Sequence, residues 1–171
     1  MSYSPLLVKM GVCNVTFDSV DMGYTKGFVK VRYSCETQEK TVDQSDTPLG
    51  VVTKKQVFEV EVPMAEYNFA ILSKVFPGAT LITDATLATK QRIELSGASV
   101  DLTALGKALI LTPVGGDAND VIEVFKAVPQ PAFDFTYDAD NVRVFNIKFL
   151  AVPDASTPSK WVHLGDATAV G

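Results

Sequence analysis

Residues that could carry catalytic chemistry are few in this chain and lie far apart in it. His163 is the only histidine, and neither a nucleophile nor an acidic cluster adjoins it. A Ser-His-Asp or Cys-His arrangement is assembled only by the fold, so the sequence leaves an enzyme with dispersed site residues as one alternative. The chain has no Gly-x-Ser-x-Gly motif, which would place a serine nucleophile on a sharp turn. We therefore expect a protein that is not an enzyme.

Two acidic segments, Asp117–Asp120 and Asp138–Asn141, carry the oxygen ligands that Ca²⁺ prefers. Neither has the glycine and the distal glutamate of an EF-hand loop, and capping of turns is the interpretation that we favour. Gly115 and Gly116 lack the spacing and the lysine of a phosphate-binding loop. No histidines and cysteines have the spacing of zinc ligands. The sequence thus predicts neither a metal site nor a cofactor.

The two cysteines, Cys13 and Cys35, are too few for a disulfide-linked scaffold. We expect two buried free thiols in a reducing compartment. The segment Met1–Met10 has no basic head followed by an apolar run, so no secretory signal is evident. Uncharged runs such as Ala108–Gly116 are much shorter than the ~18 apolar residues of a membrane helix. These features predict a soluble protein made in a cytoplasm, with no membrane partner.

The length of 171 residues predicts one domain over residues 1–171. The composition predicts that it is folded, because 47% of the residues are hydrophobic and 20% are charged. The net charge is −5. Residues 115–171 contribute most of the excess, with eight acidic and four basic side chains. Proteins that grip nucleic acid usually present a basic patch, so the charge argues against direct DNA binding. It is compatible with a surface that DNA slides past, because such a surface should repel phosphate.

Two strands are predicted near the N-terminus, Val12–Phe17 and Phe28–Cys35, and each contains one of the cysteines. From Val29 to Cys35 in the second strand, apolar residues at odd positions alternate with the polar residues Lys30, Arg32 and Ser34. Such alternation is typical of an antiparallel sheet with one buried and one solvated face. We expect the face with Val29, Val31, Tyr33 and Cys35 to be the apolar one.

The segment Glu36–Gly50 has almost no large apolar side chain and is predicted to be a long polar loop, with a mobile hairpin as its alternative form. Ordered loops of about 12–15 residues or more are uncommon and often functional. We interpret this segment as an arm that reaches a neighbouring molecule. An ordinary surface loop is the competing interpretation.

A strand at Val51–Val62 is followed by the one predicted helix, Met64–Phe76. Pro63 suits the first helical position, where its missing N–H is not needed. Most apolar residues of Met64–Phe76 share one face at helical spacing, although Asn68 falls within it and needs a hydrogen bond if buried. Pro77 and Gly78 end the helix.

The rest of the chain is predicted to be β-structure separated by turns rich in Gly, Asp and Asn. The architecture is mainly β, an antiparallel β-sandwich or barrel with one packed α-helix and a long polar loop. The predicted strands are Gln91–Leu95, Lys107–Pro113, Val121–Val128, Ala132–Tyr137 and Val142–Ala151.

Several segments, in this order and spacing, resemble phage tail tube proteins. Near the N-terminus a strand, a glycine turn and a second strand precede the polar loop, a further strand enters the helix, and a strand and a short motif follow near the C-terminus. The segments are Gly11–Asp18, Val20–Gly23, Gly27–Val31, Val42–Gln44, Thr47–Pro48, Phe58–Glu66, Phe76–Ala79, Phe149–Asp154 and Leu164–Asp166.

The resemblance implies a structural subunit of the virion tail, assembled in the cytoplasm of a host bacterium. Six copies would join their sheets edge to edge into a ring, and stacked rings would form the tube through which DNA is ejected without specific binding. Further partners would be the tape-measure protein, the tail-tip or baseplate proteins, the neck proteins and, in a contractile tail, a sheath. The helix would cover the outside of the sheet or lie between neighbours.

The same resemblance gives roles to two sets of residues. The loop would reach the adjacent ring, through Thr41, Val42, Asp43, Gln44, Thr47, Pro48 and Leu49. Acidic strand residues would line the lumen, and strand alternation makes Glu94, Glu123 and Asp134 the candidates.

Two other functions fit the same pattern. The first is an inner-tube subunit of a related contractile injection system or bacteriocin, which shares the fold. The second is a monomeric β-sandwich module that binds sugar or peptide. Such a module often presents exposed aromatic side chains, and Trp161 is the only tryptophan here. Self-assembly separates the tube interpretations from this module and from an enzyme.

Overall fold

The computed structural model describes residues 9, 11–44, 46–133, 137, 139–154 and 160–169. Within them the protein is mainly β, with one α-helix and antiparallel pairing throughout. The predicted fold class is therefore confirmed. The strands are β1 (Cys13–Phe17), β2 (Val20–Asp21), β3 (Lys30–Lys40), β4 (Gly50–Met64), β5 (Ala79–Thr83), β6 (Gln91–Leu95), β7 (Lys107–Pro113), β8 (Ile122–Phe133), β9 (Phe145–Ala151) and β10 (Val162–Leu164). The helix is α1 (Phe69–Val75), and short 3₁₀ turns are η2 (Leu102–Leu105) and η3 (Ala118–Asp120).

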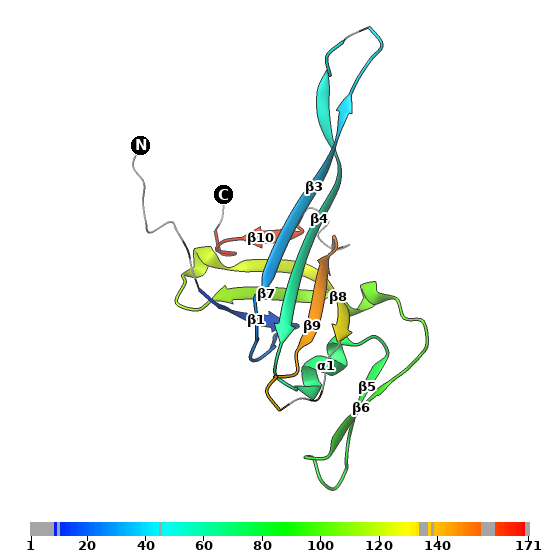
Figure 1. Ribbon diagram of the computed structural model, residues 1–171, viewed down its shortest axis with the longest axis vertical. Coiled ribbons are helices and arrows are strands. Elements are labelled where there is room, and N and C mark those ends of the chain that lie inside the picture. The colour runs from blue at the N-terminus through cyan, green and yellow to red at the C-terminus, as the bar shows by residue number, and fades with distance from the viewer. Residues whose placement is uncertain are drawn as a thin grey trace.

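Among the residues described, the main sheet has eight strands. Their order is β2-β1-β7-β8-β9-β4-β3, and β10 also pairs with β8. The first half of β8 pairs with β7 and β10, and its second half pairs with β9. Figure 1 shows β1, β7 and the first part of β8 crossing the direction of β3, β4 and β9. A strand that belongs to both layers in this way forms the corner of an orthogonal sandwich.

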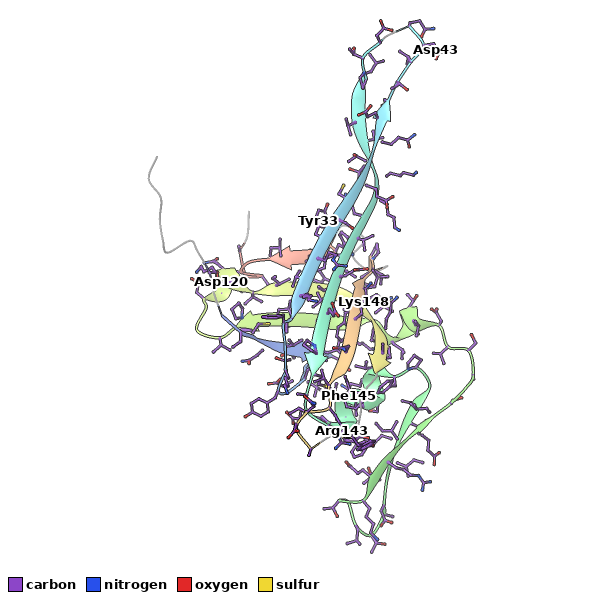
Figure 2. All side chains as sticks on the ribbon, in the orientation of Figure 1. Tyr33, Asp43, Asp120, Arg143, Phe145 and Lys148 are labelled. Atoms are coloured by element: carbon purple, nitrogen blue, oxygen red, sulfur yellow. The ribbon has the colours of Figure 1, made fainter. Side chains whose placement is uncertain are left out.

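The long β3–β4 hairpin extends far beyond this sandwich (Figures 1 and 2). We call residues 36–44 and 46–55 of this hairpin the arm, and residues 41–44 and 46–49 the arm tip. The prediction of a loop over Glu36–Gly50 is wrong in its extent, because β3 continues to Lys40 and β4 begins at Gly50. Backbone pairing forms a ladder there without apolar alternation, and the pattern therefore did not reveal it. A register shift falls between Glu36 and Thr37.

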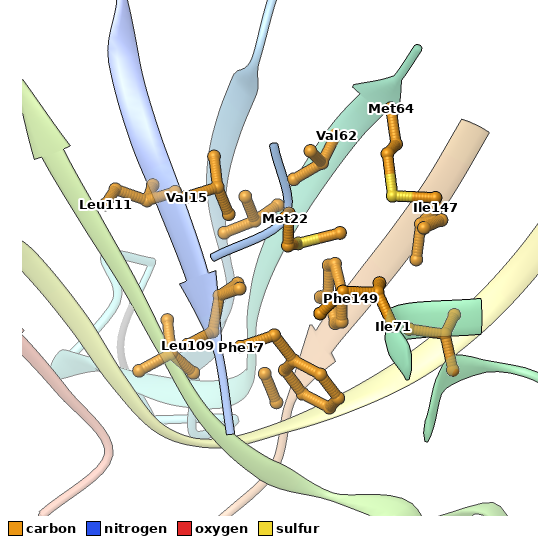
Figure 3. Packing of buried hydrophobic residues seen from close by; sticks show 14 of the residues in the cluster. Val15, Phe17, Met22, Val62, Met64, Ile71, Leu109, Leu111, Ile147 and Phe149 are labelled. Atoms are coloured by element: carbon orange, nitrogen blue, oxygen red, sulfur yellow. The ribbon is translucent and has the colours of Figure 1, made fainter. Parts of the chain in front are cut away.

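The core lies between the two layers of the sandwich, and α1 closes one of its ends (Figure 3). Phe17 of β1 contacts Phe149 of β9, with ring centroids 5.0 Å apart. Ile71 and Val75 bury the inner face of α1. Burying such side chains contributes about 1.5–3 kcal/mol each relative to exposure. The other fully buried large side chains are Met22, Met64, Leu72, Leu109, Ile147, Val15, Val60 and Val62.

The helix is shorter than predicted and begins later. Pro63 and Met64 belong to β4 and pair with Asn146 and Phe145 of β9. Asn68 is the N-cap, and its side chain accepts a hydrogen bond from the N–H of Ala70 at 2.9 Å. Val62, Pro63 and Met64 are all buried, and pairing with β9 overrides the helical signal of Pro63. Asn68 thereby obtains the hydrogen bond that the sequence required.

Elsewhere the strand predictions are confirmed in part. The bounds of β6 and β7 agree with the predicted Gln91–Leu95 and Lys107–Pro113. The two segments predicted at Val121–Val128 and Ala132–Tyr137 join in the single strand β8, which pairs with β9 as far as its own last residue, Phe133. Residues 134–136 lie outside the described residues. The segment predicted at Val142–Ala151 is β9 and begins at Phe145. The short strands β2, β5 and β10 were not predicted.

Candidate assembly surface

The outer edge of β3 is the most conspicuous unsatisfied feature of the described chain. All 11 residues of β3 are exposed, and among the described residues β3 pairs only with β4. The opposite edge of the strand therefore presents its N–H and C=O groups to solvent. An open edge of this length is a template for pairing with another chain.

The apolar side of β3 is uncovered as well. Val31 and Tyr33 lie opposite Val60 and Phe58 in the ladder, on the face of the sheet that bounds the core. Val60 and Phe58 are buried, whereas Val31 is 43% exposed and Tyr33 is 56% exposed. The alternation was predicted correctly, but the expected burial of this face is absent from the single chain. The core face of the sheet thus continues past the sandwich with nothing packed on it.

The burial expected of both cysteines is not found for Cys35, which lies on β3. Both are free thiols, Cys13 is partly buried and Cys35 is exposed. Burial raises the pKa of the Cys13 thiol. The prediction of burial is therefore wrong for Cys35, because it belongs to the uncovered face of β3.

The arm has no core of its own. A hydrogen bond from the N–H of Leu49 to the carbonyl of Lys40, 2.8 Å long, closes its tip. The apolar side chains Val42, Leu49, Val51 and Val52 are all exposed. An isolated two-stranded hairpin is at best marginally stable in water, and the arm therefore gains from contact with another surface. The residues predicted to contact an adjacent ring are exposed at the tip or beside it: Thr41, Val42, Asp43, Gln44, Thr47, Pro48 and Leu49.

The opposite face of the β3–β4–β9 layer carries paired charges that the sequence analysis did not select. Glu59 Oε1 lies 2.8 Å from Lys148 Nζ, and Glu59 Oε2 lies 3.8 Å from Arg32 Nη1. Lys30 and Glu61 form a further pair at 3.8 Å. Exposed pairs of this kind contribute about 0–1 kcal/mol each. In the sequence, Glu59 and Glu61 alternate with apolar residues, and this alternation could have predicted the charged face.

The predicted lumen residues do not lie together. Glu94 is in β6 of the separate β5–β6 sheet, where Arg92 Nη2 lies 2.8 Å from its Oε1. Glu123 is in β8 opposite His163 of β10. Asp134 lies outside the described residues. Glu94 and Glu123 are therefore on different sheets and share no face.

The side chains singled out for chemistry occupy structural positions. Phe125 packs edge-on against the His163 ring at 4.5 Å, and Glu123 Oε2 lies 4.0 Å from His163 Nδ1. Trp161 packs against Phe58 at the rim of the core, with ring centroids 6.2 Å apart, and is partly buried. No group of three or more His, Cys, Asp or Glu side chains able to hold a metal is present in the described part of the chain.

The first of the two acidic segments is a capped turn, as interpreted from the sequence. The side chain of Asp117 accepts a hydrogen bond from the N–H of Asn119 at 2.9 Å, and Asp120 accepts from the N–H of Asp117 at 3.2 Å. Lys9 Nζ lies 3.0 Å from Asp120 Oδ2, and this hydrogen bond lowers the pKa of the Asp120 carboxyl. The second segment begins at Asp138, which lies outside the described residues.

The geometry thus defines a mainly β protein whose exposed edge strand and arm are its candidate functional surface. No known family model matches the chain, and a search of curated proteins found no match to it. No helix in the described residues is long and apolar enough to cross a membrane.

Proposed function

We propose that this protein is a structural subunit of a phage tail tube, in which copies join edge to edge into hexameric rings that stack into a conduit for DNA. The observation that carries the proposal is β3. It combines an unpaired backbone edge with two exposed apolar side chains, Val31 and Tyr33, on the core face of the sheet. Both features are costly in a monomer and are satisfied together when a neighbour adds a strand and its own apolar surface.

Closed symmetry supports a ring as the product of this pairing. One side of β3 is already paired with β4, and its other side is free to pair with another chain. The strand at the opposite end of the sheet is the short β2. A contact between two different edges is heterologous, and heterologous contacts close into rings when the rotation permits. The number of six subunits in a ring comes from the sequence resemblance to tail tube subunits.

The paired charges of the β3–β4–β9 layer suit a surface that DNA passes. Binding to DNA depends on lysine and arginine side chains that neutralise phosphates. On this face Lys30, Arg32 and Lys148 each have a glutamate partner. We place this face toward the lumen, because its cations are already engaged and its polar residues remain hydrated.

The test is negative-stain electron microscopy of the purified full chain at high concentration, together with sedimentation velocity. Hollow tubes or six-fold rings are the expected result. A sample that stays monomeric over the whole concentration range would overturn the proposal and favour a monomeric binding module.

A further inference from the structure

The two ends of the molecule carry hairpins that point in opposite directions. In Figure 1 the arm tip lies at one end of the longest axis and the β5–β6 hairpin lies at the other. Copies stacked along this axis in one orientation bring the arm tip of one copy to the β5–β6 hairpin of the next. Such a head-to-tail contact repeats without closing, as the stacking of rings requires.

The arm tip has unsatisfied negative charge and an exposed apolar side chain. Asp43 and Asp46 are exposed, and neither carboxylate has an ion-pair partner among the described residues. Leu49, at the end of the tip, is 65% exposed. A partner for the tip therefore needs positive charge around a small apolar surface.

The β5–β6 hairpin has a hollow with these properties. The hollow has a volume of about 230 Å³ and is lined by Ile82, Asp84, Lys90, Gln91 and Arg92. The Lys90 ammonium has no ion-pair partner in the part of the chain that the structure describes. Arg92 is held by Glu94 in a pair that is more than half exposed on both sides, and pairs of this kind hold weakly.

One acidic group also lines the hollow and must be accounted for. Asp84 Oδ1 accepts hydrogen bonds from the N–H groups of Thr86 and Leu87, both 2.8 Å long. These bonds lower the pKa of the Asp84 carboxyl and direct one of its oxygens to its own turn. The charge of Asp84 remains in the hollow, but the two cations Lys90 and Arg92 outnumber it there.

We infer that the arm tip docks into the hollow of the β5–β6 hairpin of a second copy in the adjacent ring. Asp43 and Asp46 face Lys90 and Arg92, and Leu49 covers the apolar part of the hollow at Ile82. This inference rests on the proposed function and names the surface that receives the arm. It also gives the β5–β6 hairpin, which lies outside the main sheet, a reason to project from the sandwich.

A charge-swap series tests the docking. One variant carries Asp43→Lys and Asp46→Lys, a second carries Lys90→Glu and Arg92→Glu, and a third carries all four substitutions. All four positions are exposed, and the fold is checked by circular dichroism and thermal unfolding. Electron microscopy should show loss of tubes, with rings retained, in the first two variants and recovery of tubes in the third.

The control is Lys26→Glu with Lys160→Glu, which makes the same charge change as the second variant at two exposed positions outside β3, the arm and the hollow. This variant should form tubes as the wild type does. Tubes from the Asp43 and Asp46 variant, or failure of the four-substitution variant to recover tubes, would overturn the docking while leaving the tube proposal intact. Absence of rings and tubes in the wild type would instead overturn the proposed function, and the docking with it.

Discussion

Tyr33 and Phe58 lie directly opposite each other in the β3–β4 ladder, yet Phe58 is 5% exposed and Tyr33 is 56% exposed. The boundary of the core therefore falls between two adjacent strands of one continuous sheet. Phe58 is covered by the second layer and by Trp161, 6.2 Å away between ring centroids. Tyr33 extends the same apolar surface beyond that cover, and a neighbouring subunit is the partner that our proposal assigns to it.

Tyr33→Lys should abolish ring formation without destabilising the subunit. The side chain is already exposed, and surface substitutions usually change the free energy of unfolding by no more than about 0.5 kcal/mol. A charge placed on the apolar face would remain buried and unpaired in the ring. Sedimentation velocity and urea unfolding measure the two effects. Tyr24→Lys, at a side chain that is 83% exposed in another segment, is the control, and equal ring formation by both variants would contradict the assignment.

Replacing residues 41–48 by an Asn-Gly turn should leave rings intact but prevent them from stacking. Lys40 and Leu49 already share a hydrogen bond of 2.8 Å, so the shortened hairpin can close with a two-residue turn of the favoured type. The removed segment contributes no buried side chain among its described residues, and the melting temperature should hardly change. Electron microscopy provides the measurement. Long tubes from this variant would show that the arm tip is not the inter-ring contact.

Phe149→Ala should lower the free energy of unfolding by about 3–5 kcal/mol, because it leaves a cavity beside Phe17 in the centre of the core. Urea unfolding should be done in the Tyr33→Lys background, so that assembly does not contribute to the measured stability. Phe28→Ala removes the same side chain from a site that is 83% exposed and should have little effect. Similar losses for the two variants would contradict the location of the core.

The ion pair between Asp18 and Lys74 should make stability depend on pH in the acid range. Lys74 Nζ lies 2.7 Å from Asp18 Oδ2 and joins the turn after β1 to α1. This hydrogen bond lowers the pKa of Asp18 in the folded state. The stabilisation is therefore fully present above the unfolded pKa of about 3.9 and is lost as the pH falls through the lower folded value.

Both partners are more than a third exposed, so we expect Lys74→Met to cost only about 0.2–1 kcal/mol at pH 7. The cost should disappear at a pH below the folded pKa of Asp18, where the wild-type carboxyl is also neutral. Urea unfolding at several pH values provides the measurement, and Asp18→Asn should reproduce the effect. A cost that is the same at every pH would show that Lys74 acts through packing alone.

Local patterns determined much of the secondary structure. The bounds predicted for two strands, Gln91–Leu95 and Lys107–Pro113, agree with those of β6 and β7. Pro77 and Gly78 marked the end of the helix, since proline cannot continue it. The polarity and length of Glu36–Gly50 predicted an exposed arm. The fold class followed from the number of such short strands and the single helix.

The tertiary structure decided which apolar faces are covered and which polar stretches form strands. Helical periodicity favoured Met64 as part of a helix, but pairing of β4 with β9 kept it in a strand. The polar residues of the arm form strands because β3 and β4 remain hydrogen-bonded to each other there. Backbone hydrogen bonding does not depend on side-chain polarity, so the polarity pattern could not predict it. Alternation showed that Val31 and Tyr33 share a face, but it carries no information on whether a second layer reaches that face. Coverage depends on contacts between residues far apart in the chain, and the β3 edge is open because β3 is the last strand in the order of the sheet.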